Sequence, residues 1–235
     1  MVKETILIAL LTFRDSVNVS FLWWIDNIRA LNSDPNHPRI YEIMYVPGLR
    51  PVAFARNSAV KQFLQHPTAT KLWFIDDDLV PTDDSLKIFD SKADMVSGLY
   101  WLLLMKDSRP TFSSAIYKKI TGGFEMINPK NRLIGQNIIP IDASGTGSLL
   151  ISRKIFEDKR MLNSLEYQEA DGGITKLDEI EALPYFRTLH KSNGSEERSE
   201  DIDFTWRAKQ LGYSFESVLD ARFLHKKEML IDWFI

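Results

Sequence analysis

The sequence contains no cysteine among its 235 residues. Disulfide bonds, thiolate metal sites and a cysteine nucleophile are therefore excluded, and the composition fits a reducing compartment. Long apolar runs are missing too, because the stretch 98–105 is far too short to span a bilayer. The apolar run 5–13 has charged residues close on both sides and no small-residue cleavage site, unlike a signal peptide. We therefore expect a cytoplasmic protein without a transmembrane segment.

Glycine-rich phosphate loops are also absent. The chain has neither a P-loop nor the spaced glycines of a dinucleotide site, since Gly145-Thr146-Gly147 lacks a third glycine and comes late in the chain. A nucleophile elbow is missing as well. The formal net charge of −3 argues against a general binder of polyanions, although it is compatible with a local basic groove. If a diphosphate is bound, a metal ion must provide most of the charge neutralisation.

Length and composition are those of one ordinary soluble domain. Hydrophobic residues make up 44% and charged residues 26% of the chain, which is long enough for one α/β domain with a substantial core. The first part alternates in type, with strands expected at 5–12, 39–46 and 71–75 and helices at 16–31 and 55–65. This order predicts a parallel sheet wound with helices.

The second part is less regular. Segments 112–120 and 122–127, joined at Gly122-Gly123, predict an antiparallel hairpin beside the sheet. Residues 160–199 are polar and acidic, which favours a mobile substrate loop. The remaining expected elements are strands at 95–99, 138–143, 149–151, 214–219 and 221–224, a helix from 153, and a helix at 199–210 with Ser199 at its start and Gly212 past its end. The fold class is thus α/β: one domain with a mostly parallel central sheet, flanked by helices and carrying a small antiparallel excursion.

The most informative stretch is 71–81, where an apolar strand ends in three carboxylates. Lys71 to Ile75 reads as a buried strand. Asp76, Asp77 and Asp78 then follow at the carboxyl end, where ligands bind in open α/β sheets. Three neighbouring negative charges repel one another unless a cation lies between them. The stretch therefore predicts a divalent metal ion that carries a diphosphate.

Two ordinary explanations of these aspartates fit less well. Capping of the next helix suits Thr82 or Asp83 better, because they directly precede it. A calcium EF-hand fails, since Pro81 stands where the turn glycine belongs and Lys87 where the bidentate glutamate belongs. A purely structural role stays the alternative for the three aspartates.

His225 is the candidate for a further metal ligand. It directly follows the strand expected at 221–224, and that strand could return beside the acidic loop. The alternative is a packed or solvated histidine. Carboxylate, imidazole and phosphate oxygens together suit Mg²⁺ or Mn²⁺.

Two pairs of polar residues at helix starts have both a structural and a functional interpretation. Glu200 and Asp201 complement the dipole of the helix they open, or one of them acts as a general base. Arg56 and Asn57 are either a surface charge and a cap, or they hydrogen-bond a nucleotide base or phosphate. The sequence leaves both pairs of alternatives open.

Taken in order, these segments resemble a glycosyltransferase of the GT-A fold, which is Rossmann-like, close to the large family-2 group and its small viral and bacterial relatives. The resemblance spans nearly the whole chain. It rests on the segments 7–14 with 16–17, 55–57, 73–81 (the DxD strand), 95–100, 145–153 with 156–157, 184–186, 199–204 with Arg207 and 212–213, and on His225.

The resemblance implies transfer of a sugar from a nucleoside-diphosphate sugar, most commonly a UDP-sugar, to a hydroxyl acceptor. It implies that Mn²⁺ or Mg²⁺ is bound by Asp76, Asp78 and His225. Because the motif has a third carboxylate, Asp77, the question of which two of the three aspartates act as ligands stays open. Asp201, with Glu200 beside it, would be the catalytic base of an inverting displacement, although relatives of this architecture can also retain configuration. The residues implied in donor binding are Thr12, Arg14, Arg56, Asn57, Asp76, Asp77, Gly145, Thr146 and Gly147.

The single domain 1–235 would accordingly divide into a nucleotide-binding half, 1–100, and an acceptor-binding half, 101–235. The acceptor itself is open: a glycan, a protein, a lipid-linked sugar or a modified DNA base. The apolar end 229–235 could contact a membrane surface or another subunit. Two rival functions are a sugar-phosphate nucleotidyltransferase, for which 12–15 is a poor version of the required glycine-rich basic loop, and a catalytically silent sugar-binding module.

Overall fold

The computed structural model describes residues 3–12, 19–47, 52–106, 109–129, 136–163, 184–187, 189–190 and 196–225. Several predictions fall outside these ranges: the start of the helix expected at 16–31, the nucleotide contact of Arg14, most of the polar stretch 160–199 and the apolar end 229–235. They stay predictions.

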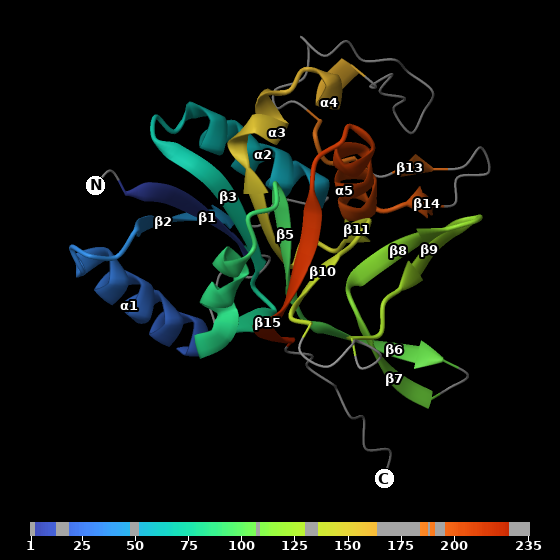
Figure 1. Ribbon diagram of the computed structural model, residues 1–235, viewed down its shortest axis with the longest axis horizontal. Coiled ribbons are helices and arrows are strands. Elements are labelled where there is room, and N and C mark those ends of the chain that lie inside the picture. The colour runs from blue at the N-terminus through green and yellow to red at the C-terminus, as the bar shows by residue number, and fades with distance from the viewer. Residues whose placement is uncertain are drawn as a thin grey trace.

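One mixed sheet forms the centre of the molecule (Figure 1). Its strands are β1 (Glu4–Thr12), β2 (Arg39–Pro47), β3 (Ala69–Asp76), β4 (Leu79–Pro81), β5 (Met95–Leu99), β10 (Ile138–Pro140), β12 (Ser148–Ser152) and β15 (Phe215–His225). They follow the order β10-β15-β5-β12-β3-β1-β2, and β4 pairs with β15. Strands β1, β2, β3, β5 and β15 run parallel, whereas β12 and β10 run antiparallel to their neighbours. The mostly parallel sheet expected from the sequence is confirmed.

Strand β1 shows how the sheet is buried on both faces. All its residues from Thr5 to Thr12 are buried, which is typical of a central parallel strand. Successive side chains point to opposite faces, so Ile6 and Ile8 join one hydrophobic cluster while Leu7 and Ala9 join another. One hydrophobic layer therefore lies on each side of the sheet.

Helices cover both of these layers. Helix α1 (Val19–Ser33) and the 3₁₀ helix Asp83–Asp90 pack on one face, through residues such as Trp24 and Phe89. Helices α2 (Val52–Gln65), α3 (Arg153–Glu157) and α5 (Glu200–Gln210) pack on the other face, and Figure 1 shows α1 set apart from them. The short α4 (Arg160–Asn163) follows α3. Within the described ranges, no helix is long and apolar enough to cross a membrane.

Antiparallel ribbons stand beside the sheet (Figure 1). Strands β8 (Ile116–Ile120) and β9 (Gly123–Met126) form the expected hairpin, and Gly122 in its turn has a φ of 86°. Strand β8 also pairs with β11 (Ala143–Ser144). The strand expected at 112–120 is divided, because β7 (Arg109–Ser114) pairs back on β6 (Trp101–Lys106) as a separate ribbon. A further pair joins β13 (Leu189–His190) and β14 (Glu196–Arg198).

The two strands expected at 214–219 and 221–224 are a single strand, β15. It pairs with β5 up to Val218, after which the register shifts and Arg222 lies opposite Leu99. Its last residues pair with β4, where His225 lies opposite Leu79. The sequence around this shift resembles a turn between two strands. In the structure the chain continues as one strand, which pairs first with β5 and then with β4.

Replacing Gly98 by alanine should destabilise the protein. A Cβ at this position of β5 would lie 2.5 Å from Phe223 Cε2 and 2.7 Å from Ser148 Oγ. Overpacking of this kind costs about 1–3 kcal/mol of unfolding free energy, which urea denaturation can measure. Gly123→Ala is the matched control, because nothing lies within 4 Å of its added methyl group. Equal losses in the two variants would contradict the close packing of β5 against β12 and β15.

Candidate active site

The ends of several strands meet at one edge of the sheet. Asp76 is the last residue of β3, and its N–H donates to the carbonyl oxygen of Gly147 at 3.0 Å. The N–H of Asp77 donates to the carbonyl oxygen of Leu11 at 3.2 Å. The end of β1, the three aspartates and the glycine turn before β12 therefore lie side by side, at the edge where open α/β sheets bind ligands.

Asp78 and His225 meet although 147 residues separate them in the sequence. His225 Nε2 lies 2.9 Å from Asp78 Oδ2, because the end of β15 pairs with β4 directly after the aspartates. The last strand thus returns beside the acidic loop, as the prediction for His225 required. Only 9% of the His225 side chain is exposed, compared with 48% for Asp78, so the carboxylate forms the open side of the pair.

The second ring nitrogen of His225 determines how this pair can bind. His225 Nδ1 lies 2.9 Å from the carbonyl oxygen of Trp101. Since a carbonyl oxygen only accepts, Nδ1 carries the proton in a neutral ring, and Nε2 faces the carboxylate of Asp78 with a lone pair. Two lone pairs in this position repel unless a proton or a metal ion lies between them. An imidazole nitrogen beside a carboxylate oxygen suits Mn²⁺ or Mg²⁺.

These two groups do not complete a metal site by themselves. Within the described ranges, no group of three or more histidine, aspartate or glutamate side chains is placed to hold an ion. Mg²⁺ is usually bound by one or two carboxylates, with substrate phosphates and waters in the remaining positions. The residues therefore fit a metal that arrives with a diphosphate. Asp76, the further ligand expected from the sequence, contacts Arg56.

Arg56 is buried between two carboxylates. Its Nη1 donates to Glu200 Oε1, and its Nη2 lies 3.4 Å from both oxygens of Asp76. Burial raises the pKa of Asp76 and that of Glu200, and the Arg56 charge opposes both shifts. The described contacts of Arg56 are thus internal, and its contact with a nucleotide stays a prediction. Glu200, expected beside the catalytic base, is its counter-ion.

Asp201 keeps one carboxylate oxygen for the site. Its Oδ1 accepts hydrogen bonds from Ser199 Oγ at 2.5 Å and from the Ile202 N–H at 2.7 Å. Its Oδ2 lies 3.5 Å from the point that a Cβ on Gly145 would occupy, on the side of the glycine turn. One oxygen therefore holds the side chain in place, while the other can accept a proton.

The glycine turn makes room for Tyr100, a residue to which the sequence assigned no role. A Cβ on Gly145 would lie 2.3 Å from Tyr100 Oη, and one on Gly147 would lie 2.8 Å from Tyr100 Cζ. The Gly147 N–H donates to Tyr100 Oη at 3.2 Å. The side of these glycines on which a Cβ would lie is thus occupied by a side chain, and donor binding at the turn stays a prediction. The feature of the sequence that could have indicated a role for Tyr100 is its position directly after an expected strand.

Asn57 serves the fold. Its Nδ2 donates to the carbonyl oxygen of Phe186, and its Oδ1 accepts from the Phe186 N–H, both at 2.9 Å. The amide group therefore holds the segment 184–187 against α2, and the expected nucleotide contact of Asn57 stays a prediction. Thr12 is buried at the end of β1, beside the aspartates in the sheet.

Two buried polar atoms at this site have no hydrogen-bond partner. In the part of the chain that the structure describes, Arg56 Nε and Thr146 Oγ1 are the buried side-chain atoms for which none is found. Buried polar groups in folded proteins are nearly always paired. Thr146 is 1% exposed and stands between the two glycines that contact Tyr100. A polar ligand at this edge of the sheet would satisfy such groups.

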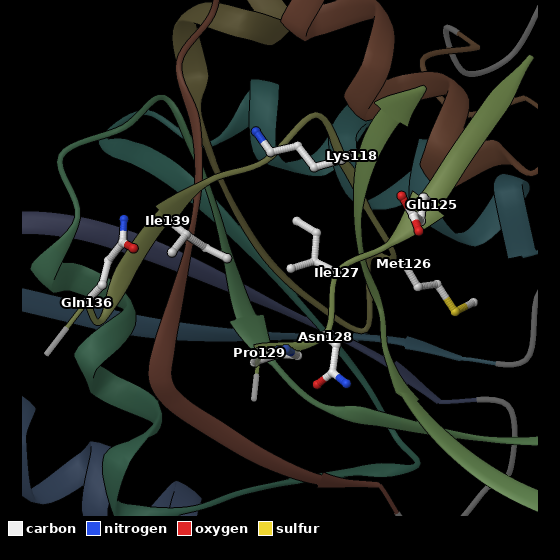
Figure 2. A pocket seen from close by; sticks show the side chains of 8 residues that line it. All are labelled: Lys118, Glu125, Met126, Ile127, Asn128, Pro129, Gln136 and Ile139. Carbon is white, nitrogen blue, oxygen red and sulfur yellow. The ribbon is translucent and has the colours of Figure 1, made fainter. Parts of the chain in front are cut away.

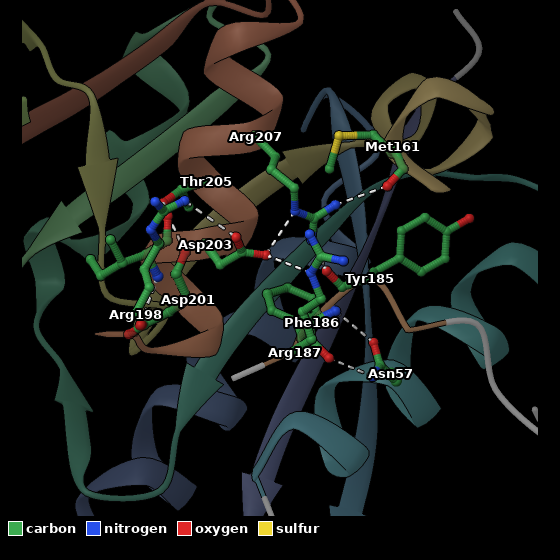
Figure 3. A network of polar contacts seen from close by, with 11 residues as sticks. Asn57, Met161, Tyr185, Phe186, Arg187, Arg198, Asp201, Asp203, Thr205 and Arg207 are labelled. Carbon is green, nitrogen blue, oxygen red and sulfur yellow. Dashed lines mark hydrogen bonds and ion pairs between the residues drawn. The ribbon is translucent and has the colours of Figure 1, made fainter. Parts of the chain in front are cut away.

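A cluster of arginines fixes the start of α5, and sequence reasoning missed it (Figure 3). Asp203 is 1% exposed and pairs with Arg207 at 2.7 Å, Arg187 at 3.2 Å and Arg198 at 3.4 Å. Arg207 also donates to two backbone carbonyl oxygens, those of Met161 and Tyr185. The network connects α5 with three neighbouring segments and thereby holds the helix turn that carries Asp201.

A cavity of about 410 Å³ lies apart from these residues (Figure 2). It opens between the β8–β9 hairpin and β10, over Ile127 and Ile139. Lys118, Glu125 and Gln136 contribute polar groups to its wall. None of the aspartates lines this cavity, so the candidate active site is defined by the strand ends.

Among solved structures, the chain is similar to A197 from STIV. The TM-score is 0.53 and the sequence identity 19%, over 94% of this chain and 86% of A197. The two proteins share a fold. At this identity the likeness shows the fold alone.

Two glycosyltransferases are less similar. The catalytic domain of Drosophila β1,4-galactosyltransferase 7, in complex with xylobiose, has a TM-score of 0.47 and 14% identity, over 95% of this chain and 71% of that one. GalNAc-T7 with UDP, GalNAc and Mn²⁺ has a TM-score of 0.49 and 10% identity, over 97% of this chain and 44% of that one. Both scores are too low to support a function. No family model matches the chain, and no curated protein matches its sequence.

Replacing Arg56 by methionine should destabilise the protein, and more strongly at high pH. Breaking a buried ion pair by removing one partner typically costs about 3–5 kcal/mol. Without the arginine, the folded-state pKa values of Asp76 and Glu200 rise further above their unfolded-state values. The folded variant then binds more protons than the unfolded chain, so its stability falls as the pH rises through that window. Urea denaturation near pH 5 and pH 8 measures both effects.

The matched control is Arg160→Met, which removes an arginine whose side chain is 62% exposed. This variant should retain the stability of the wild type at both pH values. A loss in Arg56→Met that is small, or equal at the two pH values, would contradict the buried position of the two carboxylates.

Proposed function

We propose that the protein is a metal-dependent glycosyltransferase, which moves a sugar from a nucleoside-diphosphate sugar, with UDP favoured, to a hydroxyl acceptor. One observation carries the proposal. Three strand ends and a helix start bring together the Asp78–His225 pair, the carboxylate of Asp76 and the open oxygen of Asp201. A site with a metal-binding side and a basic side is what transfer from an activated sugar requires.

The metal-binding side would hold the donor. Asp78 Oδ2 and His225 Nε2 would be protein ligands of Mn²⁺ or Mg²⁺. When bound, the metal acts as a Lewis acid that stabilises negative charge on the departing diphosphate. Asp76, held by Arg56, and the buried hydroxyl of Thr146 would contact the ribose or the donor sugar.

The basic side would activate the acceptor. Asp201 Oδ2 takes the proton of the acceptor hydroxyl, whose oxygen forms a bond to the anomeric carbon. The bond between that carbon and the diphosphate oxygen breaks, and its electron pair leaves with the diphosphate. Attack from the side of Asp201, opposite the leaving group, inverts the configuration at the anomeric carbon.

The proposal keeps the division into a nucleotide-binding half, 1–100, and an acceptor-binding half, 101–235. Asp76 and Asp78 come from the first half, and Asp201 comes from the second. His225 crosses this division, because β15 inserts beside β5 and ends at β4.

Metal-stimulated donor hydrolysis tests the function. Purified protein is incubated with a panel of UDP-, GDP- and other nucleoside-diphosphate sugars, with and without Mn²⁺, and free nucleotide is measured. We expect Mn²⁺-dependent release from at least one donor, and no such release in Asp78→Ala or His225→Ala, because each variant removes one of the two proposed ligands. The control Asp26→Ala changes an exposed aspartate on α1. A wild type that hydrolyses no donor at any metal concentration would contradict the proposal.

Asp201→Asn should separate donor binding from transfer. The amide keeps the shape of the side chain but cannot take a proton, so transfer to an acceptor should slow by about 10²–10⁴-fold. Calorimetry should show that Asp201→Asn binds UDP in the presence of Mn²⁺ with the same affinity as the wild type. Unchanged transfer in this variant would remove Asp201 from the role of base.

A further inference from the structure

Tyr100 stands between the two sides of the proposed site. It directly follows β5 and is 6% exposed. Its ring lies 6.0 Å from the ring of His225, at an angle of 85°. A Cβ added to Gly145 would lie 2.3 Å from the Tyr100 hydroxyl oxygen and 3.5 Å from Asp201 Oδ2. Both oxygens therefore approach the same side of this glycine. One side chain thus reaches from the metal-binding pair to the proposed base.

The Tyr100 hydroxyl proton has no acceptor in the described part of the chain. The oxygen accepts the Gly147 N–H at 3.2 Å, and this is the hydrogen bond found for it. A buried hydroxyl group normally donates as well as accepts. The Gly147 N–H also polarises the phenol, which strengthens the O–H as a donor. A ligand with an acceptor oxygen would satisfy this proton.

Tyr100 is a neutral hydrogen-bond donor. The ordinary pKa of a tyrosine hydroxyl is about 10, so the group carries its proton at the pH of a cell. Such a donor adds no charge to a site that already contains several carboxylates.

The chemistry of the reaction selects the acceptor of this hydrogen bond. Donation to the attacking hydroxyl oxygen would withdraw electron density from the nucleophile. Donation to Asp201 would weaken the base. The diphosphate gains negative charge as it departs, so a hydrogen bond to its oxygen becomes stronger in the transition state and lowers the barrier.

We propose that Tyr100 is a catalytic residue, whose hydroxyl donates a hydrogen bond to the departing nucleoside diphosphate beside the Asp78–His225 pair. The assignment rests on the proposed function. It gives the glycines at 145 and 147 a purpose, because any larger residue would displace the phenol.

Tyr100→Phe tests the assignment, since it removes the hydroxyl and keeps the ring that packs on the glycine turn. With the donor that the wild type uses best, kcat should fall by about 10²–10³-fold while the donor KM stays within about threefold. The affinity for UDP in the presence of Mn²⁺, measured by calorimetry, should fall by about tenfold. UDP and Mn²⁺ should also raise the melting temperature of Tyr100→Phe less than that of the wild type. Each rise is measured relative to the ligand-free value of the same protein, so a loss of stability in the variant does not affect the comparison.

Tyr213→Phe is the matched control. It removes a hydroxyl that donates to Asp158 Oδ2 at 2.7 Å, at a position that the active site does not use, and should match the wild type in kcat and UDP affinity. A kcat of Tyr100→Phe within threefold of the wild type would overturn the assignment. So would a loss confined to the donor KM, which indicates a contact held equally in ground and transition states. A wild type without metal-dependent turnover would overturn the proposed function itself.

Discussion

The buried ion pairs of Arg56 are the constraint on which the site depends. The guanidinium group from α2 contacts Asp76 at the end of β3 and Glu200 at the start of α5, so it joins three segments that are far apart in the sequence. Burying these charges is costly unless all partners are present. The arrangement therefore specifies where α5 begins relative to the sheet. Asp201, the next residue after Glu200, takes its position from this contact and from the Asp203 cluster.

The course of β15 completes the other side of the site. After a register shift that follows Val218, Arg222 pairs with Leu99 at the end of β5, and residues 223–225 pair with β4. Tyr100 directly follows β5, and its ring lies 6.0 Å from the ring of His225. The ends of β5 and β15 thus bring the phenol and the imidazole together at the carboxyl edge. Irregular strands are common next to active sites.

Local sequence pattern encodes only some parts of the candidate site. An apolar strand that ends in Asp76, Asp77 and Asp78 is visible without any partner, and so is the helix start at Asp201. The role of Arg56 and Asn57 could not be read in this way, because their partners Glu200 and Phe186 lie more than a hundred residues further along. Tyr100 was missed for a similar reason. Its importance follows from the missing side chains of Gly145 and Gly147, which a sequence shows only as small residues.

The same distinction applies to the fold. The parallel strands β1, β2 and β3 and the helices between them follow from hydrophobic periodicity, and the structure confirms them. The pairing of β6 with β7 and the continuity of β15 depend on register and tertiary contacts, which periodicity does not contain.

A crystal structure of the wild-type protein with UDP and Mn²⁺ tests the central claim most directly. The account predicts an ion in contact with both Asp78 and His225, bridged to the diphosphate, with a diphosphate oxygen within hydrogen-bonding distance of the Tyr100 hydroxyl. An ion bound elsewhere, or a nucleotide placed away from the ends of β3 and β15, would contradict it.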